Sequence, residues 1–167
     1  GRSSHAASVT YTDMADDVIE TMHDLRIGQA AVFGHSMGGK VAMQMALNAP
    51  ELVSRLIVAD IAPVAYGKNH ERILAGMKEV EGKAPQSREG ARDILAHYVD
   101  EPDVISFLMT NWRRLDDSRW GWRINLNAIY DHYNDIAAAP MGTPYNGPTL
   151  FIRGGESDYI RPEHRTE

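Results

Sequence analysis

The chain has 167 residues, of which 43% are hydrophobic and 24% are charged, and its formal net charge is −6. This composition predicts a globular protein with one sizeable core, and the negative charge argues against nucleic acid or an anionic membrane as the main partner. The absence of cysteine excludes disulfides, thiolate catalysis and zinc–cysteine sites. No apolar run approaches the roughly 18 residues that a membrane span needs.

The first predicted helix follows a loop over residues 1–10. Thr12 is its expected N-cap, and Ile27 and Gly28 end it. The apolar residues in between recur on one face of a helix. They are Met14, Val18, Ile19, Met22 and Leu25.

The stretch AAVFGHSMGGK, residues 30–40, joins a strand-like run to a glycine-rich turn, and a helical run over residues 41–47 follows. The pattern Gly-x-Ser-x-Gly between a strand and a helix is typical of a nucleophile elbow, the tight turn that presents a catalytic serine. Ser36 is therefore predicted to be a nucleophile with a strained backbone. Gly34 and Gly38 are predicted to leave the room that the turn needs, because they carry no Cβ.

The helix behind this serine directs its free N–H groups and its positive dipole end at the same place. The N–H of Met37 is the expected donor to an oxyanion that forms on the substrate. His35 and Gly39 complete the elbow. We expect the ring of His35 to point away from Ser36, so that it does not act as the base.

A second strand is predicted over residues 52–59, and Asp60 follows it directly. Helix, strand, helix and strand within about 50 residues are typical of a parallel α/β sheet. An acid at the carboxyl end of such a strand lies where α/β enzymes keep their sites. Asp60 is therefore a candidate functional residue, and a turn or helix-capping aspartate is the alternative.

The strand pattern disappears between about Tyr66 and Ala139, where short helices separated by proline and glycine are predicted. The aromatic residues in the second half of this region favour packing of a helical cap over contact with a ligand. They are Trp112, Trp120, Trp122, Tyr130 and Tyr133. The histidines of the region lack metal-ligand spacing, so no metal is predicted there. They are His70, His97 and His132.

A third strand is predicted over residues 148–153, and Asp158 follows as the second acid at a strand end. Pro162 can open another helix. The order of elements predicts a single α/β domain with a helical insertion. Its parts are an elbow-bearing core over residues 1–65, a cap over 66–140 and a continuation of the core over 141–167.

Three segments together resemble the α/β-hydrolase superfamily, and within it the small bacterial YbfF-type esterases and their ABHD11-like relatives. The segments are GHSMGGK at 34–40, DIAP at 60–63 and WRINLNAIYDHY at 122–133. The resemblance covers essentially the whole chain. It implies a mostly parallel sheet flanked by helices, with a helical cap, truncated at both ends. It also implies that the early strands, the second oxyanion donor and the catalytic histidine lie outside this chain.

Carried over residue by residue, the resemblance implies Ser36 as the nucleophile and the Met37 N–H as one oxyanion donor. For the acid, the superfamily pattern favours Asp158 and the subgroup pattern favours Asp60, so both stay open. His164 follows Asp158 too closely to be the family's histidine and is not assigned as the base.

The implied activity of the whole protein is hydrolysis of carboxylic esters, or of thioesters, through an acyl-enzyme. We expect a small-molecule acyl substrate, no cofactor and a cytoplasmic location. The same triad serves C–C bond hydrolases, lactonases and perhydrolases, and an α/β-hydrolase body can also act as a non-catalytic ligand-binding module. The segment alone is expected to be inactive because it lacks the histidine. It is also expected to be a homodimer or prone to aggregation, because its sheet is uncovered.

Overall fold

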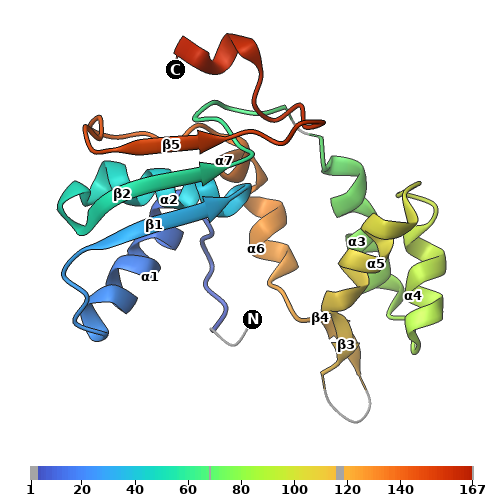
Figure 1. Cartoon of the computed structure of the whole chain (residues 1–167). Helices are drawn as coiled ribbons and strands as arrows, with labels where there is room; N and C mark the ends of the chain where they lie inside the picture. The colour runs from blue at the N-terminus through green and yellow to red at the C-terminus, as the bar shows by residue number, and fades with distance from the viewer. Residues whose placement is uncertain (1–3, 68, 116–118, 167) are drawn as a thin grey trace. The chain divides into compact units, whose positions relative to one another are not determined.

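The computed structural model describes residues 4–67, 69–115 and 119–166, the side chains of residues 165 and 166 excepted. The chain divides into two compact units (Figure 1). The helical unit consists of Gly1–Ala7 and Lys68–Asp131, and the α/β unit consists of Ser8–Gly67 and His132–Glu167. These units differ from the predicted ranges, because residues 4–7 group with the helical unit, and residues 66, 67 and 132–140 group with the α/β unit.

Three parallel strands form the centre of the α/β unit among its described residues (Figure 1). They are ordered β1 (Ala30–His35), β2 (Val53–Ala59) and β5 (Thr149–Ile152). Each lies where the sequence predicts a strand, so the predicted parallel α/β sheet is confirmed. Short apolar runs with β-branched residues suit strands that are buried by helices.

Helices cover one face of this sheet. The helix α2 (Met37–Asn48) packs on β1 and β2, and α1 (Tyr11–Asp24) packs on α2. The core between them is aliphatic and rich in methionine. Shorter elements complete the unit: η1 (Pro50–Leu52), α7 (Tyr133–Ala137) and η3 (Pro162–Thr166), the last a 3₁₀ helix where the sequence predicts a helix start.

The other face of the sheet leaves apolar side chains exposed. Phe33, Ile57 and Leu150 are register partners across the three strands and so point to the same side. Phe33 is 63% exposed and Leu150 is 54% exposed. Parallel sheets are normally covered on both faces, so this row is unusual for the surface of a folded protein.

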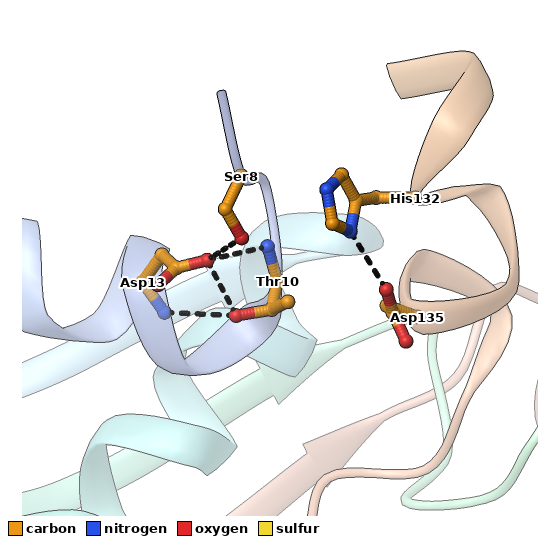
Figure 2. A network of polar contacts seen from close by, with 5 residues as sticks. All are labelled: Ser8, Thr10, Asp13, His132 and Asp135. Atoms are coloured by element: carbon orange, nitrogen blue, oxygen red, sulfur yellow. Dashed lines mark hydrogen bonds and ion pairs between the residues drawn. The ribbon is translucent and has the colours of Figure 1, made fainter. Parts of the chain in front are cut away.

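The N-cap of α1 is Thr10, and the prediction of Thr12 is wrong. The Thr10 hydroxyl accepts a hydrogen bond from Asp13 N at 3.2 Å, and the Asp13 carboxylate accepts one from Thr10 N at 3.0 Å (Figure 2). This reciprocal pair is a capping box, which needs an acid or amide three residues after the cap. Ala15 holds that position relative to Thr12 and cannot supply it. A bond from the Ser8 hydroxyl, together with the Thr10 bonds, lowers the pKa of Asp13 below its ordinary value.

The helical unit has its own core. Its helices are α3 (Glu71–Lys83), α4 (Arg88–Leu95), α5 (Pro102–Leu108), η2 (Met109–Asn111) and α6 (Leu126–Asp131). It also contains an antiparallel pair, β3 (Trp112–Arg114) and β4 (Trp120–Trp122), so the prediction that strands are absent from this region is wrong. Three-residue strands are too short to show an alternating pattern. They are held by the buried, register-paired rings of Trp112 and Trp122, whose centroids are 5.0 Å apart.

Within the part of the chain that the structure describes, no helix combines the length and the apolar character that crossing a membrane requires.

Candidate functional site

The turn between β1 and α2 has the strained backbone that the sequence predicts. Ser36 has φ 52° and ψ −124°, and a positive φ is uncommon for a residue with a side chain. Its N–H donates to Ala59 O at 2.9 Å, and its carbonyl accepts from Gly39 N at 2.8 Å. Such strain costs about 1–3 kcal/mol and persists only where the surroundings hold it, which is typical of functional positions.

The glycines that this turn requires are Gly34 and Gly39. A Cβ on Gly34 would lie 2.2 Å from Gly38 O, and a Cβ on Gly39 would lie 2.6 Å from Ile61 Cγ2. A Cβ on Gly38 would meet nothing within 4 Å, so the prediction that Gly38 supplies room is wrong. The space is needed one residue later because α2 approaches the loop after β2 at Gly39.

The start of α2 leaves groups free around the serine. The Ser36 side chain makes no capping hydrogen bond. The N–H groups of Gly39 and Lys40 are the ones that bond to the Ser36 carbonyl. The N–H groups of Met37 and Gly38 precede them and, as in any first helical turn, have no partner within the helix. The role of Met37 as an oxyanion donor stays a prediction.

Asp60 lies next to the elbow at the carboxyl end of the sheet. The strand register pairs His35 with Ala59, the residues immediately before Ser36 and Asp60. Asp60 also has a positive φ, of 57°. The structure therefore brings the predicted nucleophile and one of the two predicted acids together at adjacent strand ends.

The Asp60 carboxylate is held by the chain that follows β5. Its Oδ1 accepts a hydrogen bond from Gly154 N at 3.0 Å. This bond and one from the Ser157 hydroxyl lower the pKa of Asp60 below its ordinary value, and the charges of His35 and Arg153 act in the same direction. Asp60 is thus an ionised acceptor in a fixed place, which is what the acid of a triad needs.

Asp158 and His164 lie beyond β5, in a loop and in η3. Asp158 is exposed, and its backbone carbonyl accepts from the Arg161 side chain at 3.1 Å. The Nδ1 atom of His164 accepts from Arg161 N at 3.2 Å. A triad histidine instead donates through Nδ1 to its acid, so this geometry gives no support to His164 as a base.

The histidines predicted in the cap have other surroundings. His132 Nδ1 pairs with Asp135 Oδ2 at 2.8 Å, and Figure 2 shows this pair beside the capping box of α1. The His97 carbonyl accepts from Arg72. Among the described residues, no group of three or more histidine, aspartate or glutamate side chains is arranged to hold a metal ion.

A groove of about 480 Å³ lies at the opposite end of the sheet. Its lining includes Gln29, Val53 and Pro148, which stand before or at the first residues of β1, β2 and β5. Ser36 and Asp60 follow the carboxyl ends of strands, so this groove does not belong to their site.

Lys40 is a buried polar residue of α2 for which no role is predicted from the sequence. Its side chain is 1% exposed, and Nζ donates to the carbonyls of Val64 and Ala138. A lysine between two glycines and an apolar helical run is a weak indication of such a role, because lysine is seldom buried.

Comparison with known proteins gives consistent findings. A family model described as "alpha/beta hydrolase fold" matches residues 1–96. The chain is 41% identical to the sn-1-specific diacylglycerol lipase ABHD11 of Danio rerio, an alignment that covers 100% of this chain and 55% of that protein. It is 32% identical to the esterase YbfF of Escherichia coli (strain K12), covering 100% of this chain and 64% of that protein.

A solved structure described as a marine microorganism esterase is 34% identical, with a TM-score of 0.91. That alignment covers 98% of this chain and 66% of the other. The chain spans somewhat more than half the length of these curated relatives.

Proposed function

The chain belongs to the α/β-hydrolase fold family, and from this membership we propose that the whole protein is a serine hydrolase of carboxylic esters whose nucleophile is Ser36. The observation that carries the proposal is the positive φ of Ser36 at the turn between β1 and α2. Relatives that are named as an esterase and a lipase support the ester class. The proposed substrate is a small acyl ester, and thioesters fall within the same chemistry.

In this proposal the Ser36 hydroxyl attacks the acyl carbonyl while a histidine accepts its proton. The Met37 N–H, at the start of α2, donates to the oxyanion that forms. The alcohol leaves with a proton from the histidine, and water then hydrolyses the acyl-enzyme. Neither His35 nor His164 is assigned as the base, and the proposed base lies in a part of the protein outside this chain.

Asp60 is the better supported acid, and Asp158 is kept as the alternative. Asp60 follows the strand that pairs directly with the strand before Ser36, whereas Asp158 follows the strand one position further along. The Asp60 carboxylate is also held in place by the hydrogen bond from Gly154 N. An ionised acid orients the histidine and stabilises the imidazolium that forms.

The test is covalent labelling of the full-length protein with a fluorophosphonate probe. We expect Ser36→Ala to abolish labelling and to lower kcat on a short-chain aryl ester by about 10⁴-fold or more, because the nucleophile is lost. Ser54→Ala, a change at a half-buried serine in β2, is the matched control and should label like the wild type. Labelling that survives Ser36→Ala would overturn the assignment.

We also propose that the isolated 167-residue chain self-associates through the uncovered sheet face. Phe33→Glu places a charge in the exposed apolar row and should shift the sedimentation profile toward monomer. Leu25→Glu changes an equally exposed residue at the end of α1 and should leave association unchanged. A monomeric wild-type chain with a cooperative thermal transition would contradict this proposal.

A further inference from the structure

Lys40 is a buried cation, and no carboxylate of the described residues pairs with it. Nζ donates to Ala138 O at 2.9 Å and to Val64 O, and within the described residues it forms no salt bridge. The rings of Tyr66 and Tyr11 face the ammonium at 5.0 and 5.8 Å. Carbonyl oxygens and ring faces are both favourable partners for a desolvated cation. Burial nonetheless lowers the pKa of Lys40 to about 8.

The chain that returns from the helical unit is held at three successive carbonyls. Ile136 O accepts from the Tyr11 hydroxyl, Ala137 O accepts from Tyr66 N at 2.8 Å, and Ala138 O accepts from Lys40 Nζ at 2.9 Å. These donors come from α1, from the loop after β2 and from α2. The returning segment is therefore fixed to three separate parts of the α/β unit.

The loop that follows Asp60 is also bound by the Lys40 ammonium. Asp60 N donates to Ile152 O at 2.7 Å, and four residues later Val64 O accepts from Lys40. Between them, Ala62 N donates to the Tyr66 hydroxyl at 2.8 Å. The loop from Asp60 to Tyr66 is thus anchored at its start by the sheet, at Val64 by Lys40 and at Tyr66 by Ala137 O.

Among the described residues, two hydrogen bonds connect the segment of the nucleophile, residues 36–40, to the segment of the candidate acid, residues 59–64. One joins Ser36 N to Ala59 O in the backbone, and the other joins Lys40 Nζ to Val64 O. Ser36 and Lys40 are four residues apart at the start of α2, which is about one helical turn. A displacement of about 1 Å between reacting groups can cost about 100-fold in rate, so a second connection is chemically significant.

Resting on the function proposed above, we propose that Lys40 is a positioning residue of the hydrolytic site. Its ammonium holds the loop behind Asp60 against the elbow helix and ties both to the segment returning from the helical unit. Lys40 itself touches neither substrate nor reacting atoms in this role. It acts through the position of Asp60.

Gln44 provides a matched control, because it is buried one turn further along α2. Its side-chain amide donates to Met141 O at 2.8 Å and accepts from Met141 N at 3.1 Å. It therefore ties the same helix to the returning chain, but it makes no bond to the loop after Asp60. Replacing Gln44 therefore removes buried hydrogen bonds between α2 and the returning chain but leaves the bond from Lys40 to Val64 intact.

The first measurement is amide hydrogen exchange in the full-length protein. In Lys40→Met we expect the amides of Ala62 and Tyr66 to exchange about tenfold faster or more, as for loss of a charge-assisted hydrogen bond. Lys40→Arg keeps the charge and the donors and should restore protection. Gln44→Leu should accelerate exchange at Met141 only. Unchanged exchange at Ala62 and Tyr66 in Lys40→Met would overturn the proposal.

The second measurement separates positioning from simple structural support. We expect Lys40→Met to lower kcat about tenfold or more on a short-chain aryl ester at unchanged KM, and to have no further effect in the Asp60→Asn background. Equal losses in both backgrounds would contradict action through Asp60. If Lys40→Met does not fold, Lys40→Gln, which keeps a single amide donor group, takes its place under the same criteria.

The two proposals fail in different ways. Absence of fluorophosphonate labelling at Ser36 in the wild type would refute the hydrolase function. The exchange rates of Ala62 and Tyr66 would still decide whether Lys40 holds this loop, because that measurement needs no substrate.

Discussion

The turn at Ser36 and the cluster around Lys40 lie about one helical turn apart on α2, yet they are held by different means. The turn is fixed by backbone hydrogen bonds and by close approaches that exclude a Cβ at Gly34 and Gly39. The cluster is fixed by a side chain that reaches carbonyls 24 and 98 residues away in the sequence. The turn depends on small residues at two positions, whereas the cluster depends on one long cation.

Because the turn is held by backbone contacts and the Lys40 cluster by side-chain hydrogen bonds, we expect them to respond differently to substitution. The turn has no conservative replacement at Gly34 or Gly39, because a Cβ added at either position meets main-chain or core atoms. A cluster made of side-chain hydrogen bonds tolerates another donor of similar reach. Asp60 stands between these regions, since its loop is attached to both.

The largest effect is expected from the acid itself. We expect Asp60→Asn to lower kcat of the full-length protein by about 10⁴-fold, because the histidine loses the group that sets its tautomer. Asp158→Asn should change kcat by less than about tenfold, as for an exposed loop residue outside the triad. Steady-state kinetics of the two variants decide between the acids, and the opposite order would move the assignment to Asp158.

Asp60→Asn should also change the response to acid. The pKa of Asp60 is lower in the folded than in the unfolded chain, so its carboxylate contributes stability above its ordinary pKa. This contribution is lost as the pH falls through the folded-state pKa. Denaturant midpoints measured from pH 6 downward should therefore fall less steeply in the variant than in the wild type.

A smaller effect is expected from the glycines of the turn. Gly34→Ala should lower the free energy of unfolding by about 1–3 kcal/mol or more, because its Cβ would overlap Gly38 O. Gly38→Ala should change it by less than about 1 kcal/mol, since the new methyl group meets open space and alanine favours a helix. Chemical denaturation measures the free energy of unfolding of both variants, provided that its dependence on denaturant concentration has the same slope as in the wild type. If Gly34→Ala and Gly38→Ala destabilise the protein equally, the close contact between Gly34 and Gly38 O does not restrict the turn.

An effect of similar size, confined to alkaline pH, is expected from the ionisation of Lys40. Its pKa is about 8 in the folded protein and 10.5 ordinarily, so between these values the unfolded chain binds more protons. The free energy of unfolding of the wild type should then rise by about 1–3 kcal/mol relative to Lys40→Met as the pH increases from 8 to 10.5. Below pH 8 the difference should be constant. If the difference in free energy of unfolding between the wild type and Lys40→Met does not change with pH up to 10.5, the burial of the Lys40 ammonium is contradicted.

Several features of the structure could be predicted from the sequence alone. The three strands, the elbow pattern and the position of Asp60 directly after a strand all follow from runs of fewer than ten residues. The sequence also contains the signal for the cap of α1, because Thr10 and Asp13 have the spacing of a capping box, but the prediction of Thr12 does not use that signal. The hairpin of Trp112 and Trp122 was not, because its strands are three residues long and its support is a contact between the two rings.

The sequence by itself determined the parallel α/β class and the serine at the turn. Local periodicity sets the class, and the glycines two residues before and two residues after Ser36 mark the turn. Only the tertiary structure decided that Gly39 rather than Gly38 must lack a side chain. The atom that a Cβ on Gly39 would meet belongs to Ile61, in the loop after β2, which folding brings against α2. The tertiary structure alone decided the burial of Lys40, because the partners that stabilise this cation lie on other elements. Local patterns specify backbone shape, but the environment of a charge depends on residues that only folding brings together.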